Sequence, residues 1–206
     1  AGNRSFDPNV PEEINRRIID HLADFNFPYS ERARGNLLAE GLHPSRVVLS
    51  GSPLVEVLEH YAALIDNSDI LNQLSLDDKR YIVVSAHRQE NFDSPGRLQQ
   101  LTSLLARIRD HYKMPLLVST HPRTRDRLSA LSLNSNLDGI VLHEPFGFPD
   151  YIRLQRSAYC VLSDSGTISE EASICRFPAV TLRRAIERPE ALETGTLTLS
   201  DLDSER

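Results

Sequence analysis

The sequence predicts an α/β fold in which helices cover both faces of a parallel, Rossmann-like sheet. Short apolar runs of strand length recur along the chain, and helix-length segments lie between many of them. Polar clusters follow several of these runs directly, and ligands bind at this carboxyl edge of a parallel sheet. The expected strands are residues 47–49, 81–84, 116–118, 140–142, 159–162, 179–182 and 196–199.

Composition narrows the class of protein. The chain has 206 residues, 40% of them hydrophobic and 25% charged, which suits one large or two small domains with a buried core. No apolar run reaches the roughly 18 to 20 residues that cross a bilayer, and no secretory signal begins the chain. The net charge of −6 argues against a nucleic-acid or anionic-membrane surface, so an anionic partner would be small. Cys160 and Cys175 read as small buried hydrophobes, which favours a cytoplasmic location.

The first fifty residues predict two helices before a domain boundary. Pro11 is followed by acidic residues and begins a predicted helix, whose apolar side is formed by Ile14, Ile18, Ile19 and Leu22. A second helix is expected over residues 30–41. Residues 51–53, Gly-Ser-Pro, lead from a short strand into a third helix, so residues 1–50 and 51–206 are predicted to belong to different domains.

Glu12 and Arg16 are four residues apart in the first predicted helix and therefore share a face. This spacing suits a surface salt bridge worth about a few tenths of a kcal/mol. It equally suits two groups that point at one ligand. The spacing alone leaves both readings open.

The segment from Ser163 to Glu171 joins a predicted buried strand to a predicted helix. The free N–H groups and the positive dipole end of such a helix bind phosphate at the carboxyl edge of the sheet. Gly166 allows close approach of the backbone, and Glu171 lies about one turn further on, within reach of ribose hydroxyls. The alternative is an ordinary helix start with Ser165 or Asp164 as its N-cap.

Three further polar clusters follow strands. His87 begins one of them and could donate to phosphate, or it could be a loop histidine that caps the next helix. His121 stands in the same position after the next strand, within a segment that also reads as a basic loop. Arg188 follows the strand at residues 179–182, where its planar guanidinium suits a diphosphate but also suits a surface charge cluster.

Four motifs together resemble the non-hydrolysing UDP-N-acetylglucosamine 2-epimerase family, over nearly the whole chain. They are Pro-Glu-Glu-x-Asn-Arg from residue 11, His-Arg-x-Glu-Asn from residue 87, Asp-Ser-Gly-x-x-x-Glu-Glu from residue 164 and Glu-Arg-Pro-Glu from residue 187. The resemblance implies a glycosyltransferase-B-type fold of two Rossmann-like domains. Residues 1–50 would comprise the end of the first domain and the linker, and residues 51–206 would form a truncated second domain that binds UDP.

The resemblance also implies a role for each matching residue. Glu12 would be an acid/base carboxylate, and His87 a catalytic group at the junction of sugar and diphosphate. The implied substrate-binding residues are Arg16 and His87 on the substrate, Phe146 and Tyr151 on uracil, Ser165, Gly166 and Thr167 on phosphate, Glu171 on ribose, and Arg188 on the diphosphate. Thr167 departs from the family pattern, which has a second glycine there.

Family chemistry implies elimination of UDP across C1 and C2 of a UDP-2-acetamido sugar, followed by re-addition on the other face. No cofactor and no metal are implied, the partner is the UDP-sugar, and a homodimer is common in the family. Two further family acids match positions upstream of Ala1, so the fragment alone is predicted to be inactive.

Two substrates and two rival classes stay open. Residues 51–53, 121–125 and 164–167 are similar to a capsule and O-antigen branch that converts UDP-2-acetamido-2,6-dideoxy-L-talose to UDP-N-acetyl-L-fucosamine. His121 resembles an allosteric substrate position of some bacterial members. A UDP-sugar glycosyltransferase would share the phosphate turn, although the helix that carries Glu12 argues against a glycosyltransferase. A non-catalytic UDP-sugar-binding fragment would share the turn as well.

Overall fold

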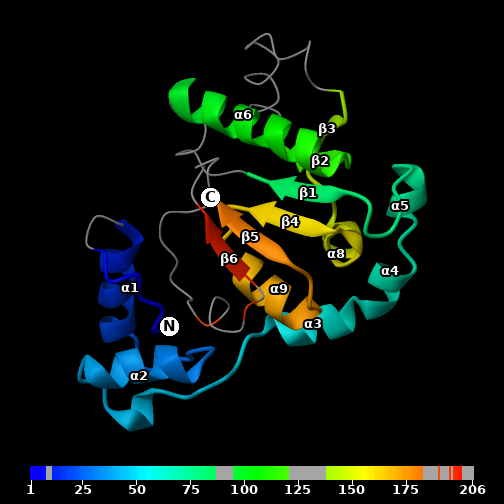
Figure 1. Ribbon diagram of the computed structural model, residues 1–206. Helices are drawn as coiled ribbons and strands as arrows, with labels where there is room; N and C mark the ends of the chain where they lie inside the picture. Colours follow the sequence, from blue (N-terminus) through cyan, green and yellow to red (C-terminus); the bar gives the residue numbers. More distant parts are fainter. Residues whose placement is uncertain are drawn as a thin grey trace. The chain divides into compact units, whose positions relative to one another are not determined.

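The computed structural model describes residues 1–7, 11–86, 95–120, 138–182, 190, 195 and 197–200. These residues form two compact units (Figure 1). The first extends to Glu59 and includes Glu190, and the second begins at His60 and contains the sheet. Each unit has a hydrophobic core of its own.

Two helices, α1 (Pro11–Leu22) and α2 (Glu31–Ala39), dominate the first unit and confirm the helices that the sequence predicts there. Ser30 is the N-cap of α2, and its hydroxyl accepts a hydrogen bond from the Ala33 N–H at 3.2 Å. A short 3-10 turn, η1 (Pro44–Arg46), follows. The small core of this unit consists of Leu37, Leu42 and Val47, with Leu38 packed against it.

Charge also holds the first unit together. The buried Arg4 guanidinium donates to Asp20 at 2.8 Å and to both carboxylate oxygens of Glu40 at 2.7 Å. The Gly2 N–H donates to the same Asp20 oxygen at 2.9 Å. The hydrogen bonds from Arg4 lower the pKa of Glu40 to about 2, because they stabilise its charged form. The cluster therefore fastens the N-terminal segment to α1 and to the end of α2.

The periodicity of α1 identifies an apolar side, but this side is exposed within the described part of the chain. Its four apolar positions are 52% to 79% exposed: Ile14, Ile18, Ile19 and Leu22. The buried positions of the helix are the acidic Glu13 and Asp20, which bind the N-terminal segment. Periodicity thus predicts the faces of a helix without deciding which face is covered.

The prediction of a strand at residues 47–49 is wrong. This segment is extended, but its pairing consists of an isolated parallel bridge between Val47 and Asn26. The side chains of Val48 and Leu49 are exposed, so the apolar run lacks the burial that a sheet interior would give it. Helix α3 (Leu54–His60) comes next, and α4 (Ala62–Asp66) and α5 (Ile70–Gln73) follow in the second unit.

The second unit is built on a six-stranded sheet in which every pair of neighbours is parallel, as the sequence predicts. The strand order is β3-β2-β1-β4-β5-β6, the order of a Rossmann fold. The direction of winding reverses between β1 and β4, which makes their carboxyl ends the switch point. The strands are β1 (Ile82–Ser85), β2 (Leu116–Ser119), β3 (Ile140–His143), β4 (Cys160–Ser163), β5 (Ala179–Leu182) and β6 (Leu197–Ser200).

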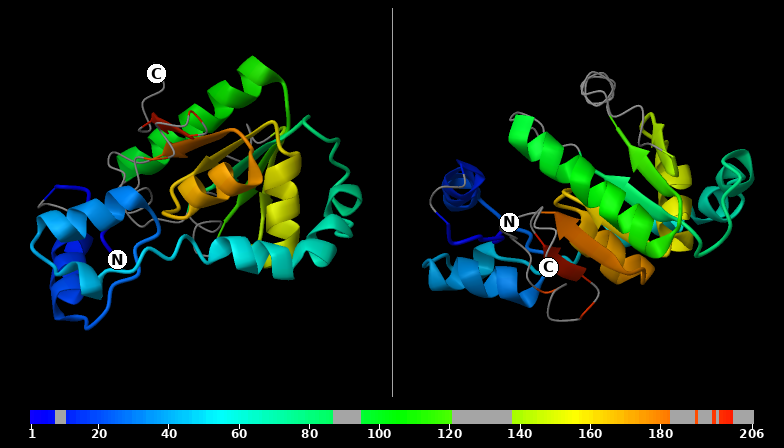
Figure 2. Two further views of the ribbon diagram at one scale, coloured as in Figure 1. Left: turned by 90° about the horizontal axis from the view of Figure 1, so that it is seen from below. Right: turned by 45° about the horizontal axis from the view of Figure 1, so that its top comes forward.

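Helices lie on both faces of this sheet (Figure 2). Helix α6 (Pro95–Tyr112) covers one face, where Leu101 and Leu105 pack on alternate strand residues such as Ile82 and Leu116. Helices α8 (Phe148–Ser157) and α9 (Ile168–Cys175) cover the other face. On that side the buried Tyr81 hydroxyl donates to the Leu154 carbonyl at 2.7 Å and so fastens α8 to the sheet.

Candidate functional site

The turn after β4 lies at the switch point of the sheet. The Asp164 N–H donates to the Ser85 carbonyl at 3.1 Å, which ties the start of the turn to the end of β1. Ser163 and Asp164 are buried, whereas Gly166 and Thr167 are exposed. The chain therefore emerges to the surface where open α/β sheets bind their ligands.

The hydroxyl groups of the turn form a directed relay. Thr167 donates its hydroxyl proton to Glu171 Oε1 at 2.6 Å, because a carboxylate can only accept. In the 2.9 Å contact between Ser165 Oγ and Thr167 Oγ1, Ser165 must then be the donor. Ser165 Oγ in turn accepts from the Thr167 N–H at 3.3 Å. The relay joins the predicted phosphate turn to the predicted ribose ligand.

Thr167 occupies the position where the family pattern has glycine, and its backbone is ordinary. It has φ −85° and ψ −14°, in the right-handed helical region that any residue adopts. It is also the residue at the N-cap position of α9, and it makes no side-chain capping bond. The N-cap position is thus Thr167 and not Ser165 or Asp164, although Ser165 Oγ accepts the Thr167 N–H as a capping side chain would. The side chain at position 167 is engaged with Glu171 instead.

Glu171 is held from two sides. Besides Thr167, the side-chain amide of Gln155 donates from Nε2 to Glu171 Oε2 at 2.7 Å. Gln155 comes from α8 and is fully buried, whereas Glu171 is half-buried. A carboxylate has about four lone-pair sites, so one bond to each oxygen leaves capacity for further donors such as sugar hydroxyls. Glu171 is thus fixed in place and still able to accept.

Tyr151 lies beside this carboxylate on α8. Burial raises the pKa of Tyr151 to about 12, so its phenol is neutral at ordinary pH. The phenol interacts with the side chains of Ser85 and Gln155 and so lies between the end of β1 and the amide that holds Glu171. The uracil contact expected of Tyr151 from the sequence stays a prediction.

A row of hydroxyl groups across the sheet edge was missed by the sequence reasoning. Ser85 pairs in register with Ser119 on one side and Ser163 on the other, and Ser163 pairs with Thr181. All four are buried, and Ser163 Oγ accepts the Ser165 N–H at 3.1 Å. The signal was available in the sequence, because each of these residues comes last in, or near the end of, an apolar run.

Phe146 lies just beyond the carboxyl end of β3. Its ring stacks on His143 with a centroid distance of 4.1 Å and an interplanar angle of 12°. Both side chains are half-buried. The stacked pair offers a flat aromatic surface at the same edge of the sheet as the turn, and His143 is a second residue that the sequence reasoning did not single out.

In the first unit, the structure distinguishes the two adjacent glutamates of the α1 motif. Glu13 is buried and accepts from the Ser5 N–H at 2.8 Å and from Arg17 at 3.1 Å. Burial alone would raise the pKa of Glu13, but these hydrogen bonds outweigh it and lower the pKa. Glu12 is exposed, and Arg16 is half-buried. Glu13 is thus committed to structure, which leaves Glu12 as the candidate for chemistry.

Three candidate residues fall outside the described residues: His87, His121 and Arg188. Glu190, the last residue of the motif that contains Arg188, is described. Its carboxylate accepts a hydrogen bond from the hydroxyl of Ser30, the N-cap of α2, within the first unit. This end of the motif therefore has a structural partner.

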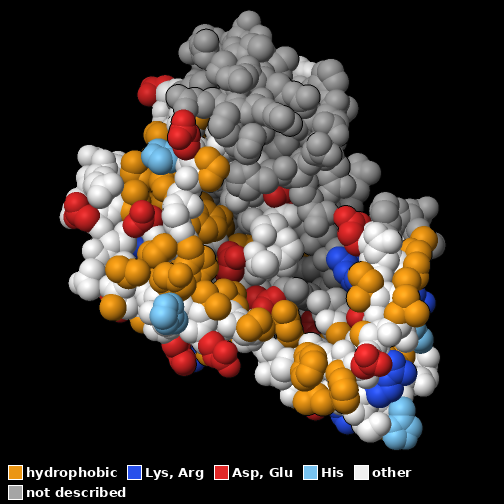
Figure 3. Space-filling view, turned by 180° about the vertical axis from the view of Figure 1, so that it is seen from behind, with side chains coloured by type: hydrophobic (Ala, Val, Ile, Leu, Met, Phe, Trp, Pro, Cys, Tyr) orange, Lys and Arg blue, Asp and Glu red, His pale blue; other side chains and the backbone are white. Residues whose placement is uncertain are grey.

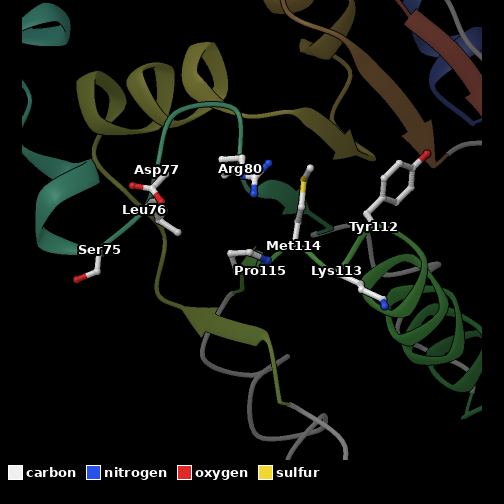
Figure 4. A pocket seen from close by; sticks show the side chains of 8 residues that line it. All are labelled: Ser75, Leu76, Asp77, Arg80, Tyr112, Lys113, Met114 and Pro115. Atoms are coloured by element: carbon white, nitrogen blue, oxygen red, sulfur yellow. The ribbon is translucent and has the colours of Figure 1, made fainter.

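A pocket at the opposite edge of the sheet carries none of the predicted site residues (Figure 4). It is lined by residues that precede β1 and β2: Ser75, Leu76, Asp77, Arg80, Tyr112, Lys113, Met114 and Pro115.

Figure 3 shows acidic side chains scattered among hydrophobic ones on one face. Among the described helices, none combines the length and apolar character of a membrane span. The described residues also contain no cluster of three His, Cys, Asp or Glu suited to a metal.

Comparisons with known proteins identify the family of this chain. A sequence model of the UDP-N-acetylglucosamine 2-epimerase family matches residues 1–206. The chain belongs to this family. UDP-N-acetylglucosamine 2-epimerase of Methanocaldococcus jannaschii is 36% identical over 202 residues, which are 95% of this chain and 55% of that protein. The Methanococcus maripaludis enzyme is 31% identical over 212 residues, and the match covers 100% of this chain and 58% of that enzyme.

Solved 2-epimerase structures share the fold. The enzyme from Rickettsia bellii superimposes with a TM-score of 0.91 at 46% identity, over all of this chain and 54% of that one. The M. jannaschii enzyme, solved in complex with UDP-GlcNAc and UDP, gives 0.88 at 34% identity and is covered to 58%. The chain thus spans about half the length of the 2-epimerases it matches. The family and the Rossmann-like fold predicted from the sequence are confirmed.

Proposed function

We propose that this chain is the nucleotide-binding half of a non-hydrolysing 2-epimerase that inverts C2 of a UDP-2-acetamido sugar. The relay from Ser165 through Thr167 to Glu171 supports the proposal most directly, since it links a phosphate turn to a ribose carboxylate at the switch point. The bound UDP-GlcNAc and UDP of the related M. jannaschii enzyme support this class of ligand. This epimerisation would be one step in the synthesis of cell-surface polysaccharide and would take place in the cytoplasm.

In this proposal, the second unit binds the nucleotide. Residues 165–167 and Arg188 hold the diphosphate, and Glu171 accepts the ribose hydroxyls. Phe146 and Tyr151 form the walls of the uracil site. The aromatic surface of Phe146, with His143 behind it, suits a flat base. A full complement of donors on the diphosphate stabilises UDP as a leaving group.

Glu12, Arg16 and His87 then act on the sugar. A carboxylate removes the proton from C2, the C–H electron pair becomes the C1–C2 double bond, and the C1–O bond to UDP breaks. UDP departs with that bonding pair and leaves a 2-acetamidoglycal. Re-addition of UDP and return of a proton to the opposite face of C2 give the epimer. The electrons balance within the substrate, so the step requires no redox partner.

Solvent deuterium tests the reaction. The full-length protein, incubated with UDP-GlcNAc in D₂O, is expected to incorporate deuterium at C2, because the abstracted proton exchanges with solvent. A glycosyltransferase leaves the C2 proton in place, so a product without deuterium at C2 would refute the epimerase. Binding of UDP without any turnover would favour the non-catalytic reading.

The identity of the sugar is a separate proposal. We favour UDP-GlcNAc. The alternative is UDP-2-acetamido-2,6-dideoxy-L-talose, which is supported by the similarity of residues 51–53, 121–125 and 164–167 to the capsule and O-antigen branch. The two sugars differ at C6 as well as in ring configuration. Parallel assays with both are expected to give a much higher kcat/KM for one of them, and equal values would show that the site does not discriminate.

A further inference from the structure

Gln155 is a residue that neither the motifs nor the proposed reaction uses. It lies on α8, its side chain is fully buried, and its Nε2 donates to Glu171 Oε2 at 2.7 Å. Among the described residues its Oε1 has no hydrogen-bond partner. A buried amide with one end unsatisfied is costly, so the other end must make a valuable contact.

The charge of Glu171 explains this orientation. A carboxylate only accepts hydrogen bonds, so the amide must turn its NH₂ group toward Glu171 and its oxygen away. The amide NH₂ group makes this bond to Glu171. The Tyr151 phenol, one turn earlier on α8, interacts with the side chains of Gln155 and Ser85 and so lies between the amide and the end of β1.

We infer that Gln155 is a positioning residue, which fixes the Glu171 carboxylate so that its remaining lone pairs face the ribose hydroxyls of the nucleotide. This inference rests on the proposed function, because it assumes that Glu171 is the ribose ligand. Thr167 restrains the other oxygen of the same carboxylate. With only one of these two bonds, the carboxylate can rotate about its side-chain torsions, and the ribose contacts lose their preorganised geometry.

A pair of nucleotides separates this role from a general effect on folding. In the full-length protein, Gln155→Met removes the amide and keeps most of its volume. We expect the affinity for UDP, measured by calorimetry, to fall about tenfold. Affinity for 2′,3′-dideoxy-UDP, which lacks the ribose hydroxyls, should change by less than about twofold. Gln100→Met, an exposed substitution on α6, is the matched control and should leave both affinities unchanged.

A second variant uses charge instead of volume. Gln155→Glu places a carboxylate against Glu171, and two carboxylates in contact share a proton only as the pH falls. The ratio of the variant's Kd for UDP to that of the wild type should therefore be large at pH 8 and fall toward one at pH 5. The ratio cancels the ionisation of UDP itself. The same ratio is measured for 2′,3′-dideoxy-UDP, and an equal pH dependence for both nucleotides would report the added charge alone and contradict the positioning role.

The outcomes are distinct. If the wild-type protein does not bind UDP, the proposed function fails and this inference fails with it. If UDP binds and Gln155→Met weakens both nucleotides equally, or neither, the proposed function stands and Gln155 has no positioning role. Thermal unfolding of each variant is measured alongside, and Gln155→Glu takes the place of Gln155→Met in the nucleotide comparison if Gln155→Met does not fold.

Discussion

Different interactions stabilise the interior of each of the two units. The first is organised around a buried cation, Arg4, that bonds carboxylates from α1 and from the end of α2. The second is organised around an apolar parallel sheet, and most of its described buried polar side chains are neutral hydroxyls and amides, with Asp164 as a buried carboxylate. A buried ion pair is costly to break, whereas a neutral hydrogen bond contributes modestly. The first unit should therefore be the more sensitive to single substitutions and to acid.

The difference also bears on function. In the second unit, the neutral network surrounds one half-buried carboxylate, Glu171, which stays available to a ligand. In the first unit, the buried carboxylates Glu13 and Asp20 are bound by arginine side chains and backbone N–H groups, whereas Glu12 is exposed. Each unit thus separates the acids that maintain structure from the acid that is proposed to act on substrate.

Removal of the central cation should have the largest effect. Arg4→Met leaves Asp20 and Glu40 without their shared partner, and we expect a loss of about 3–5 kcal/mol from the first unit. Hydrogen exchange followed by mass spectrometry measures this unit by unit: peptides from residues 11–59 should lose protection, and peptides from residues 101–119 should keep it.

Arg34→Met is the matched control. Arg34 pairs with Glu31 on the surface of α2 at 3.2 Å, and exposed pairs of this kind contribute about 0–1 kcal/mol. If Arg4→Met proves as mild as Arg34→Met, the charged cluster does not hold the first unit, and the contrast between the two units collapses.

Acid should weaken the same cluster without mutation. The folded protein depresses the pKa of Glu40 from 4.5 to about 2 and also lowers the pKa of Glu13. A depressed carboxylate stabilises the fold above its unfolded pKa, and this contribution is lost as the pH falls through the folded value. Protection of the first unit should therefore decline between about pH 4.5 and 2. A decline that spares residues 11–59 but affects the sheet would contradict the assignment.

A smaller effect is expected at Gly2. Its φ of +76° disfavours any side chain, and a Cβ would lie 2.2 Å from the Ala33 carbonyl oxygen. Gly2→Ala should cost about 2–3 kcal/mol through strain and overpacking. Gly41 has φ +90° but open space around its Cβ position, so Gly41→Ala should show only the conformational cost of about 1 kcal/mol. Denaturant titration of both variants isolates the clash, and equal losses would argue against the close approach.

Local sequence signals predicted the sheet unit well. Apolar runs bounded by polar residues predicted the six strands. The four central strands are buried on both faces and must therefore be apolar throughout, whereas the edge strands β3 and β6 are only partly buried. The same logic failed at Val48 and Leu49, where an apolar run is exposed. It also left the exposure of Ile18 and Ile19 open, since composition does not reveal whether a neighbour covers a surface.

The candidate site was predictable to the extent that its motifs are contiguous. Ser165 and Glu171 are close in sequence, so their connection follows from one turn of helix. Gln155 and Ser85 reach the same network from other elements, and only the strand order, with β4 beside β1, brings them there. Long-range contacts of this kind depend on topology, and no spacing within the sequence encodes them directly.

The smallest effect is expected within the sheet unit itself. Tyr81→Phe removes the hydroxyl that donates to the Leu154 carbonyl and leaves the ring in place. Because the lost interaction is a single neutral hydrogen bond, the second unit should lose about 1 kcal/mol, well below the effect of Arg4→Met. Chemical denaturation, read by exchange of the peptides that carry β1 and α8, provides the measurement. A loss of about 3 kcal/mol or more would place a neutral contact on a par with the buried ion cluster, and the two units would then not differ in the way proposed.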